Sequence, residues 1–154
     1  MKMMIARTVA GVAAAFMAVT FAMAADRASK DEAVAFANRA AAYWKKSGRD
    51  AALAEFNSPK GQFIDRDLYI FALDAATGKA LAHGANAKLV GRDLMALKDP
   101  EGKLFVKEML QVGAAGKPAW VDYKWPNPTS QQVESKSSYV LKVDDIVIGV
   151  GVYK

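Results

Sequence analysis

The last third of the chain constrains the fold most, because it consists of three strand-like segments joined by turns. Residues 120–125 alternate bulky side chains and end at the proline-rich turn 126–128. Residues 137–143 and 146–153 follow, and Asp144-Asp145 makes the tight turn between them. Strands that are this close in the sequence pair antiparallel. The segment therefore predicts an antiparallel sheet.

Helices precede this segment. Apolar residues recur every three or four positions over residues 26–46, which predicts a long helix that stops at Ser47-Gly48, and a short helix follows at 50–56. Residues 68–74 and 79–83 predict a strand pair, and a further helix should begin at Asp99-Pro100, with Asp99 as its N-cap. The order of elements predicts an α+β fold, with an antiparallel sheet and helices on one face.

Residues 1–24 have the features of a secretory signal peptide. Lys2 and Arg7 supply the basic start, an apolar stretch follows, and Ala22-Met23-Ala24 is an A-x-A cleavage site. The alternative is a membrane anchor, but the uncharged run is only about 18 residues long, near the minimum for a span. We expect cleavage after Ala24, a single domain at residues 25–154, and a periplasmic or secreted protein.

Composition narrows the possible functions. The chain has no cysteine and one histidine, so the sequence predicts no cofactor and no metal site. Loss of the signal peptide lowers the number of Lys and Arg residues from 21 to 19 against 16 acidic residues. The basic residues form no stripe, which argues against nucleic-acid binding. No Gly-x-Ser-x-Gly turn, phosphate loop or dinucleotide fingerprint occurs, so we expect no enzyme activity.

Several short motifs in order along the chain resemble the single Cache domain, the extracytoplasmic ligand-sensing module of bacterial chemoreceptors and sensor kinases. They are Tyr69-Ile70-Phe71, Ala82-His83, residues 89–94, residues 120–128, residues 136–140 and residues 149–153. The resemblance implies a PAS-like fold, in which a long N-terminal helix packs beside a curved antiparallel sheet of about five strands. It also implies a small organic acid as ligand. The chain departs from the pattern at Gly84, where a proline commonly follows the histidine.

Six residues are candidates for ligand binding. Lys136 at a strand start would pair with an anion, although a solvated lysine paired with Glu134 is the alternative. Tyr123 and Tyr139 would donate phenol hydroxyls, or else pack in the core. The remaining candidates are Tyr69, Trp120 and His83.

The three remaining candidates also have alternatives. Tyr69 shares a strand face with Phe71, which fits a core residue, but its position in the family pattern favours the pocket. His83 is either a pocket donor or a turn residue. Trp120 and Trp125 should face opposite sides of their strand. We therefore assign Trp120 to the pocket wall and Trp125 to a structural role at the proline turn.

Two functions remain open at this stage. The first is an exported domain that binds a short carboxylate and contributes to signal transduction, with a membrane sensor kinase or chemoreceptor as partner. The second is a structural or interaction module with a degenerate pocket, which forms a homodimer through its N-terminal helix. A pocket that combines Lys136 with buried tyrosines favours the first function, and a pocket filled by its own side chains favours the second.

Overall fold

The computed structural model describes residues 26–154. The predicted signal peptide and the start of the mature chain at Ala25 lie outside the described residues. Across residues 26–154, no helix combines the length and the apolar character needed to cross a membrane.

Helix α1 (Lys30–Ser47) confirms the long helix predicted from the apolar periodicity. It begins after Ser29, whose side chain accepts a hydrogen bond from the backbone N–H of Glu32 while the Glu32 carboxylate accepts one from the Ser29 N–H. This reciprocal capping box satisfies two backbone donors that a helix start leaves unpaired. Gly48, at a φ of +81°, ends α1 and leads directly into α2 (Arg49–Asn57).

Five antiparallel strands form the main sheet in the order β4-β3-β7-β6-β5. Their bounds are β3 Phe71–Asp74, β4 Ala80–His83, β5 Ala119–Pro126, β6 Val133–Val143 and β7 Ile146–Tyr153. The predicted strand at 68–74 is broken at Ile70, because β2 (Leu68–Tyr69) pairs with β1 (Ile64–Asp65) in a separate two-stranded hairpin. The expected α+β fold with a five-stranded antiparallel sheet is confirmed.

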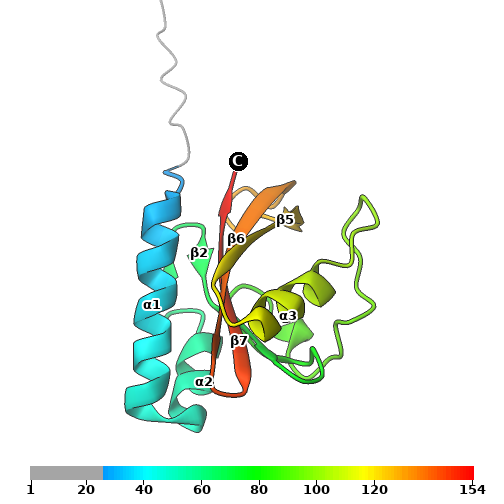
Figure 1. Cartoon of the computed structure of the whole chain (residues 1–154). Helices are drawn as coiled ribbons and strands as arrows, with labels where there is room; N and C mark the ends of the chain where they lie inside the picture. The colour runs from blue at the N-terminus through cyan, green and yellow to red at the C-terminus, as the bar shows by residue number, and fades with distance from the viewer. Residues whose placement is uncertain (1–25) are drawn as a thin grey trace, which may run out of the picture.

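The helices cover both faces of the sheet (Figure 1), so the prediction that they lie on one face was wrong. One face packs against α1 and α2, and we call it the α1 face. The other face packs against α3 (Phe105–Ala115), and we call it the α3 face. Alternation along β7 supplies both faces: Ile146, Ile148 and Val150 belong to the α1 face, and Val147 belongs to the α3 face.

Helix α3 begins at Phe105, later than predicted, and Asp99 is not its N-cap. The Asp99 carboxylate instead accepts hydrogen bonds from the backbone N–H groups of Glu101, Lys103 and Lys124. The contact with Lys124 holds the connection before α3 against the edge strand β5. This tertiary contact competes with helix capping for the same side chain.

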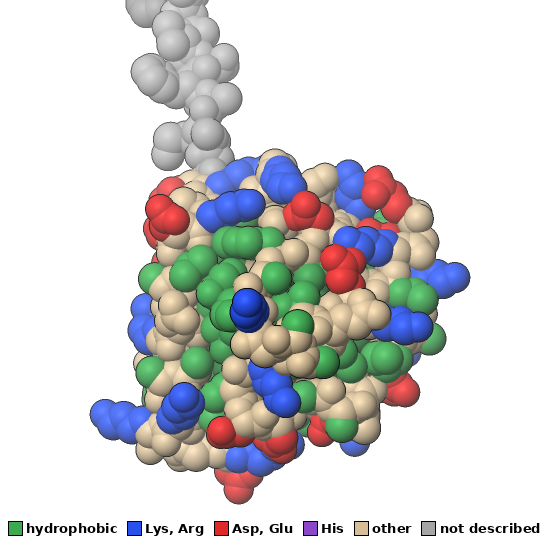
Figure 2. Space-filling model, in the orientation of Figure 1, with side chains coloured by type: hydrophobic (Ala, Val, Ile, Leu, Met, Phe, Trp, Pro, Cys, Tyr) green, Lys and Arg blue, Asp and Glu red, His purple; other side chains and the backbone are tan. Residues whose placement is uncertain are grey.

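The described chain starts and ends at the same end of the molecule (Figure 1). Arg27 forms an ion pair with Glu134 at 2.7 Å and donates a hydrogen bond to the backbone carbonyl of Lys154 at 3.2 Å. On the face of the molecule that Figure 2 shows, basic and acidic side chains are interspersed around a central group of hydrophobic side chains.

Candidate ligand-binding site

Two glycines in the central strand β7 make room for the site on the α3 face. A Cβ atom at Gly149 would overlap the ring of Phe71, and one at Gly151 would overlap the side chain of Lys136. Both glycines therefore permit a large side chain to lie directly on the backbone of β7. Through this arrangement the Lys136 side chain crosses β7 and reaches Tyr69 on β2.

Lys136 is buried, with an exposed fraction of 1%, although lysine side chains are seldom fully buried without a partner charge. Its Nζ donates a hydrogen bond to the Tyr69 hydroxyl at 2.7 Å, the one hydrogen bond that the described residues give it. No carboxylate of residues 26–154 lies within 4.0 Å of Nζ. Burial lowers the pKa of Lys136 to about 7. The solvated, Glu134-paired lysine considered as an alternative is thus not what the structure shows.

Aromatic rings surround the ammonium group. Nζ lies 4.2 Å from the ring centroid of Tyr69, 5.1 Å from that of Tyr153, 5.6 Å from that of Phe71 and 5.8 Å from that of Tyr123. Cation–π attraction offsets part of the cost of desolvating a cation. It does not replace a counter-ion, because a buried unpaired charge costs several kcal/mol.

The tyrosines come from strands on either side of Lys136. In the sheet register Lys136 is paired with Tyr123 on β5 and with Tyr153 on β7, so all three side chains lie on the α3 face. The Tyr123 hydroxyl forms a hydrogen bond of 2.9 Å with Ser138, and the Tyr153 hydroxyl donates to the Pro126 carbonyl at 2.8 Å. Burial raises the pKa of Tyr69, Tyr123 and Tyr153, so their hydroxyls stay protonated at neutral pH.

His83 ends β4 and is buried beside the same rings. Its ring centroid lies 4.9 Å from that of Tyr69 and 6.2 Å from that of Trp125. Its Nδ1 accepts a hydrogen bond from the backbone N–H of Asn86, so the proton of the neutral ring is on Nε2, which is free to donate. Burial, together with the positive charge of Lys136, lowers the pKa of His83 to about 3 and keeps it neutral.

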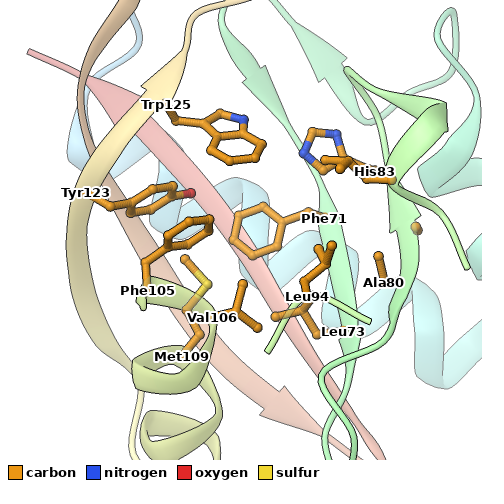
Figure 3. Close-up of a pocket in the computed structure, with 12 residues that line it drawn as sticks. Phe71, Leu73, Ala80, His83, Leu94, Phe105, Val106, Met109, Tyr123 and Trp125 are labelled. Atoms are coloured by element: carbon orange, nitrogen blue, oxygen red, sulfur yellow. The ribbon is translucent and has the colours of Figure 1, made fainter. Parts of the chain in front are cut away.

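A cavity lies beside this cluster, between α3 and the sheet. Figure 3 shows the rings of Phe71, His83, Tyr123 and Trp125 converging on it. Its volume is about 20 Å³, room for one or two water molecules. Lys136 does not line this cavity, although its Nζ lies 5.6 Å and 5.8 Å from the ring centroids of Phe71 and Tyr123, which do. Lys136 instead lines a second, polar pocket of about 300 Å³, together with Tyr123, Asp122, Lys124 and Ser135.

The structure brings four of the six predicted residues together: Lys136, Tyr69, Tyr123 and His83. The other two, Trp120 and Tyr139, pack against the α1 face. The strand register pairs them with each other, and Trp120 also carries the Lys30 ammonium over its ring at 4.6 Å. Both lie three positions from a residue of the site, and an odd spacing on a strand turns a side chain to the opposite face.

Sequence reasoning missed three aromatic residues of the site. Trp125, which we assigned a structural role, lines the cavity, as does Phe71. The expectation that Trp120 and Trp125 face opposite sides is nevertheless confirmed. Tyr153 stands opposite Lys136 in the register of β6 with β7, which the two-residue turn Asp144-Asp145 fixes, so this neighbour could have been found by counting from the turn. Strand alternation could have identified Trp125, because residues two positions apart on a strand share a face, as Tyr123 and Trp125 do.

The five-stranded antiparallel sheet beside a long N-terminal helix is the fold that the resemblance to sensor domains implies. The model of the family described as single Cache domain 2 matches residues 3–154. The chain therefore belongs to this family of extracytoplasmic sensor domains.

Two curated relatives are a chemotaxis protein and a sensor histidine kinase. The chain is 35% identical over 91 residues to the methyl-accepting chemotaxis protein McpP of Pseudomonas putida, and 31% identical over 90 residues to the sensor histidine kinase MctS of Rhizobium johnstonii. The matches cover 58% and 57% of this chain but only 16% and 19% of the relatives. The matched segment thus spans less than a fifth of each relative's length.

Solved structures show the same fold. A methyl-accepting chemotaxis protein of Vibrio parahaemolyticus superimposes with a TM-score of 0.69 at 24% identity, over 80% of this chain and 87% of that one. The periplasmic sensor domain of a chemotaxis protein gives 0.63 at 27% identity, over 80% and 88%. A Cache chemosensory domain described in terms of carboxylic acid recognition gives 0.61 at 24% identity, over 80% and 86%.

Proposed function

We propose that this sensor domain binds a short organic acid through its carboxylate, with Lys136 as the anion partner, and contributes to signal transduction. The observation that carries the proposal is a buried ammonium whose only hydrogen-bond acceptor, among the described residues, is the neutral Tyr69 hydroxyl. An ammonium has three donors, so two remain for a ligand. A carboxylate would supply both the missing acceptors and the missing charge.

Neutral donors beside Lys136 complete the proposed anion site. His83 is oriented by Asn86 so that its Nε2–H is available, and the Tyr123 hydroxyl can turn from Ser138 toward a ligand. The apolar side chains that line the cavity would have to move apart to take the hydrocarbon tail. Because the cavity is small, we expect ligands of about two to four carbons, and each added methylene changes the binding free energy by only about 1–3 kcal/mol.

A thermal-shift screen with acetate, propionate, butyrate, amino acids and amines tests the proposal. A ligand that binds the folded state raises the melting temperature by mass action. We expect a shift with a short carboxylate that Lys136→Ala abolishes without unfolding the domain. Lys142→Ala, an exposed lysine on the same strand, is the matched control and should keep the shift. Carboxylate binding that survives Lys136→Ala would contradict the anion site.

A second candidate function follows from the small cavity. A site that its own side chains nearly fill is also what an interaction module with a degenerate pocket would have. Such a module would act through α1, as a homodimer or against a membrane sensor kinase or chemoreceptor. A cooperative melt that no compound shifts, together with a dimer in solution, would favour this function.

We further propose that residues 1–24 direct export to the periplasm or the cell exterior and are cleaved after Ala24. The extracytoplasmic character of the family supports this proposal. Determination of the N-terminus of the protein recovered from the periplasm tests it. A chain that begins at Ala25 is expected, whereas an intact N-terminus in the membrane fraction would indicate a retained anchor.

A further inference from the structure

A buried carboxylate lies close to the site without belonging to it. Asp67 sits in the turn between β1 and β2 and has an exposed fraction of 1%. Its Oδ1 accepts a hydrogen bond of 3.0 Å from the backbone N–H of Ala28, while its Oδ2 is buried and has no hydrogen-bond partner among the described residues. A carboxylate in this position is costly unless a nearby positive charge compensates it.

The adjacent arginine does not provide that compensation. Arg66 is engaged with three exposed carboxylates, those of Asp26, Glu32 and Asp65. Lys136 is the better counter-charge, because it is buried and its Nζ contacts Tyr69, two positions after Asp67 on the same hairpin. The negative charge of Asp67 raises the pKa of Lys136 against the opposing effect of burial, and it also raises that of Tyr153.

We propose that Asp67 is a positioning residue of the anion site, which keeps the Lys136 ammonium charged without occupying its hydrogen-bond donors. The separation is essential to this role. A carboxylate in direct contact with Nζ would fill the position that a ligand needs, whereas no carboxylate of residues 26–154 lies within 4.0 Å of it. The role in ligand binding rests on the proposed function, but the charge coupling between Asp67 and Lys136 does not.

The other titratable groups that face Lys136 cannot replace Asp67. Tyr69 from β2, Tyr123 from β5 and Tyr153 from β7 have raised pKa values and stay neutral. His83 from β4 has a pKa of about 3 and is neutral as well. The negative charge of Glu134 contributes to the raised pKa of Tyr153, but Glu134 is ion-paired with Arg27. Asp99, Glu101 and Asp122 line a pocket together with Lys136, but Asp67 is the carboxylate whose charge raises the pKa of Lys136.

The test compares the titration of Lys136 in variants of the ligand-free protein. The ¹³Cε resonance of Lys136, assigned with Lys136→Arg, reports the pH at which the amine is half protonated. We expect Asp67→Asn to lower this pH by at least about one unit, as loss of a nearby opposite charge does. Asp65→Asn removes an exposed carboxylate from the same hairpin and should leave it unchanged. An unchanged midpoint in folded Asp67→Asn would overturn the inference.

A measurement on the unmodified protein covers the case in which Asp67→Asn does not fold. The carboxyl ¹³C resonance of Asp67 should then show a step at the pH where Lys136 titrates, because coupling between two charges is reciprocal. A resonance without such a step contradicts the coupling.

Acetate binding separates a positioning role from a purely structural one. In Asp67→Asn, acetate affinity should fall off at a lower pH than in the unmodified protein, while the affinity at about pH 5.5 is retained. A purely structural role would weaken binding by the same factor at every pH. Failure of acetate and its homologues to bind the unmodified protein would contradict the proposed function. A Lys136 titration midpoint that is the same in Asp67→Asn and in the unmodified protein would contradict only this inference.

Discussion

The two faces of the sheet differ in what their aromatic side chains pack against. On the α1 face, the ring of Phe63 packs edge-on against Phe36, Tyr43 and Phe56, with centroid distances of 5.9, 5.5 and 5.1 Å. On the α3 face, rings of similar size enclose the charge of Lys136. The first arrangement stabilises the fold, and the second costs stability unless a counter-ion is present. The α1 face therefore stabilises the domain, and the α3 face carries the proposed ligand site.

The largest expected loss of stability comes from the α1 face. Phe63→Ala should lower the free energy of unfolding by about 3–5 kcal/mol, because it removes a buried ring that three others contact. Acetate affinity of the remaining folded protein should change by less than about twofold, since the site lies across the sheet. Urea denaturation and calorimetric titration measure the two quantities. Phe105→Ala, on the α3 face, is the counterpart and should change both, because Phe105 stacks on Tyr123 at 4.4 Å.

A substitution at the centre of the α3 face should raise the free energy of unfolding instead of lowering it. Lys136→Met should raise the free energy of unfolding at pH 7 by about 2–4 kcal/mol while eliminating acetate binding, because methionine fills the space without a charge.

The pH dependence distinguishes this explanation from improved packing. The pKa of Lys136 is about 7 in the folded protein, below its usual value of 10.5, so the unfolded chain binds more protons between these values. The stability contributed by residue 136 therefore rises with pH across this window, and the advantage of Lys136→Met should vanish near pH 10.5. An advantage that is the same at pH 7 and pH 10 would show that packing, not charge, is responsible.

Substitutions of the two glycines of β7 should have smaller effects, one mainly on stability and the other mainly on acetate binding. Gly149→Ala should destabilise the protein by about 1–3 kcal/mol, because the new methyl group meets the ring of Phe71 in a packed environment. Gly151→Ala meets the Lys136 side chain and the Ser138 hydroxyl instead, and by displacing them it should mainly weaken acetate binding. Thermal unfolding and titration of both variants measure this, and equal losses of affinity would contradict the separate roles.

The smallest expected effect concerns two of the residues that sequence reasoning placed in the site. Trp120→Leu and Tyr139→Phe should leave acetate affinity unchanged within about twofold, since both residues pack on the α1 face. Tyr123→Phe, on the α3 face of the same strand as Trp120, is the positive control and should weaken binding. A tenfold loss in Trp120→Leu would require the ligand to lie elsewhere.

Much of the fold could be predicted from local sequence. The apolar period gave α1 its correct extent within a few residues, and the last strand was placed correctly because Asp144-Asp145 marks its turn. The errors came from tertiary contacts. Asp99 has the side chain of an N-cap, but it caps a turn that is anchored to Lys124.

The candidate site was predictable only where residue type and strand parity agreed. Lys136 and Tyr123 were identifiable, but Tyr139 is three positions from Lys136 and so points to the other face. Tyr153 could have been placed by counting from the turn Asp144-Asp145, whereas Asp67 depends on how a distant segment packs, which local patterns do not specify.

Proton uptake on acetate binding tests most directly whether the bound carboxylate pairs with the Lys136 ammonium. Calorimetric titration at pH 8.5, in buffers with different ionisation enthalpies, counts the protons bound with each acetate. An anion beside Nζ favours the charged amine, so we predict uptake of nearly one proton at pH 8.5 and almost none at pH 5.5. Acetate binding without proton uptake at pH 8.5 would contradict Lys136 as the anion partner.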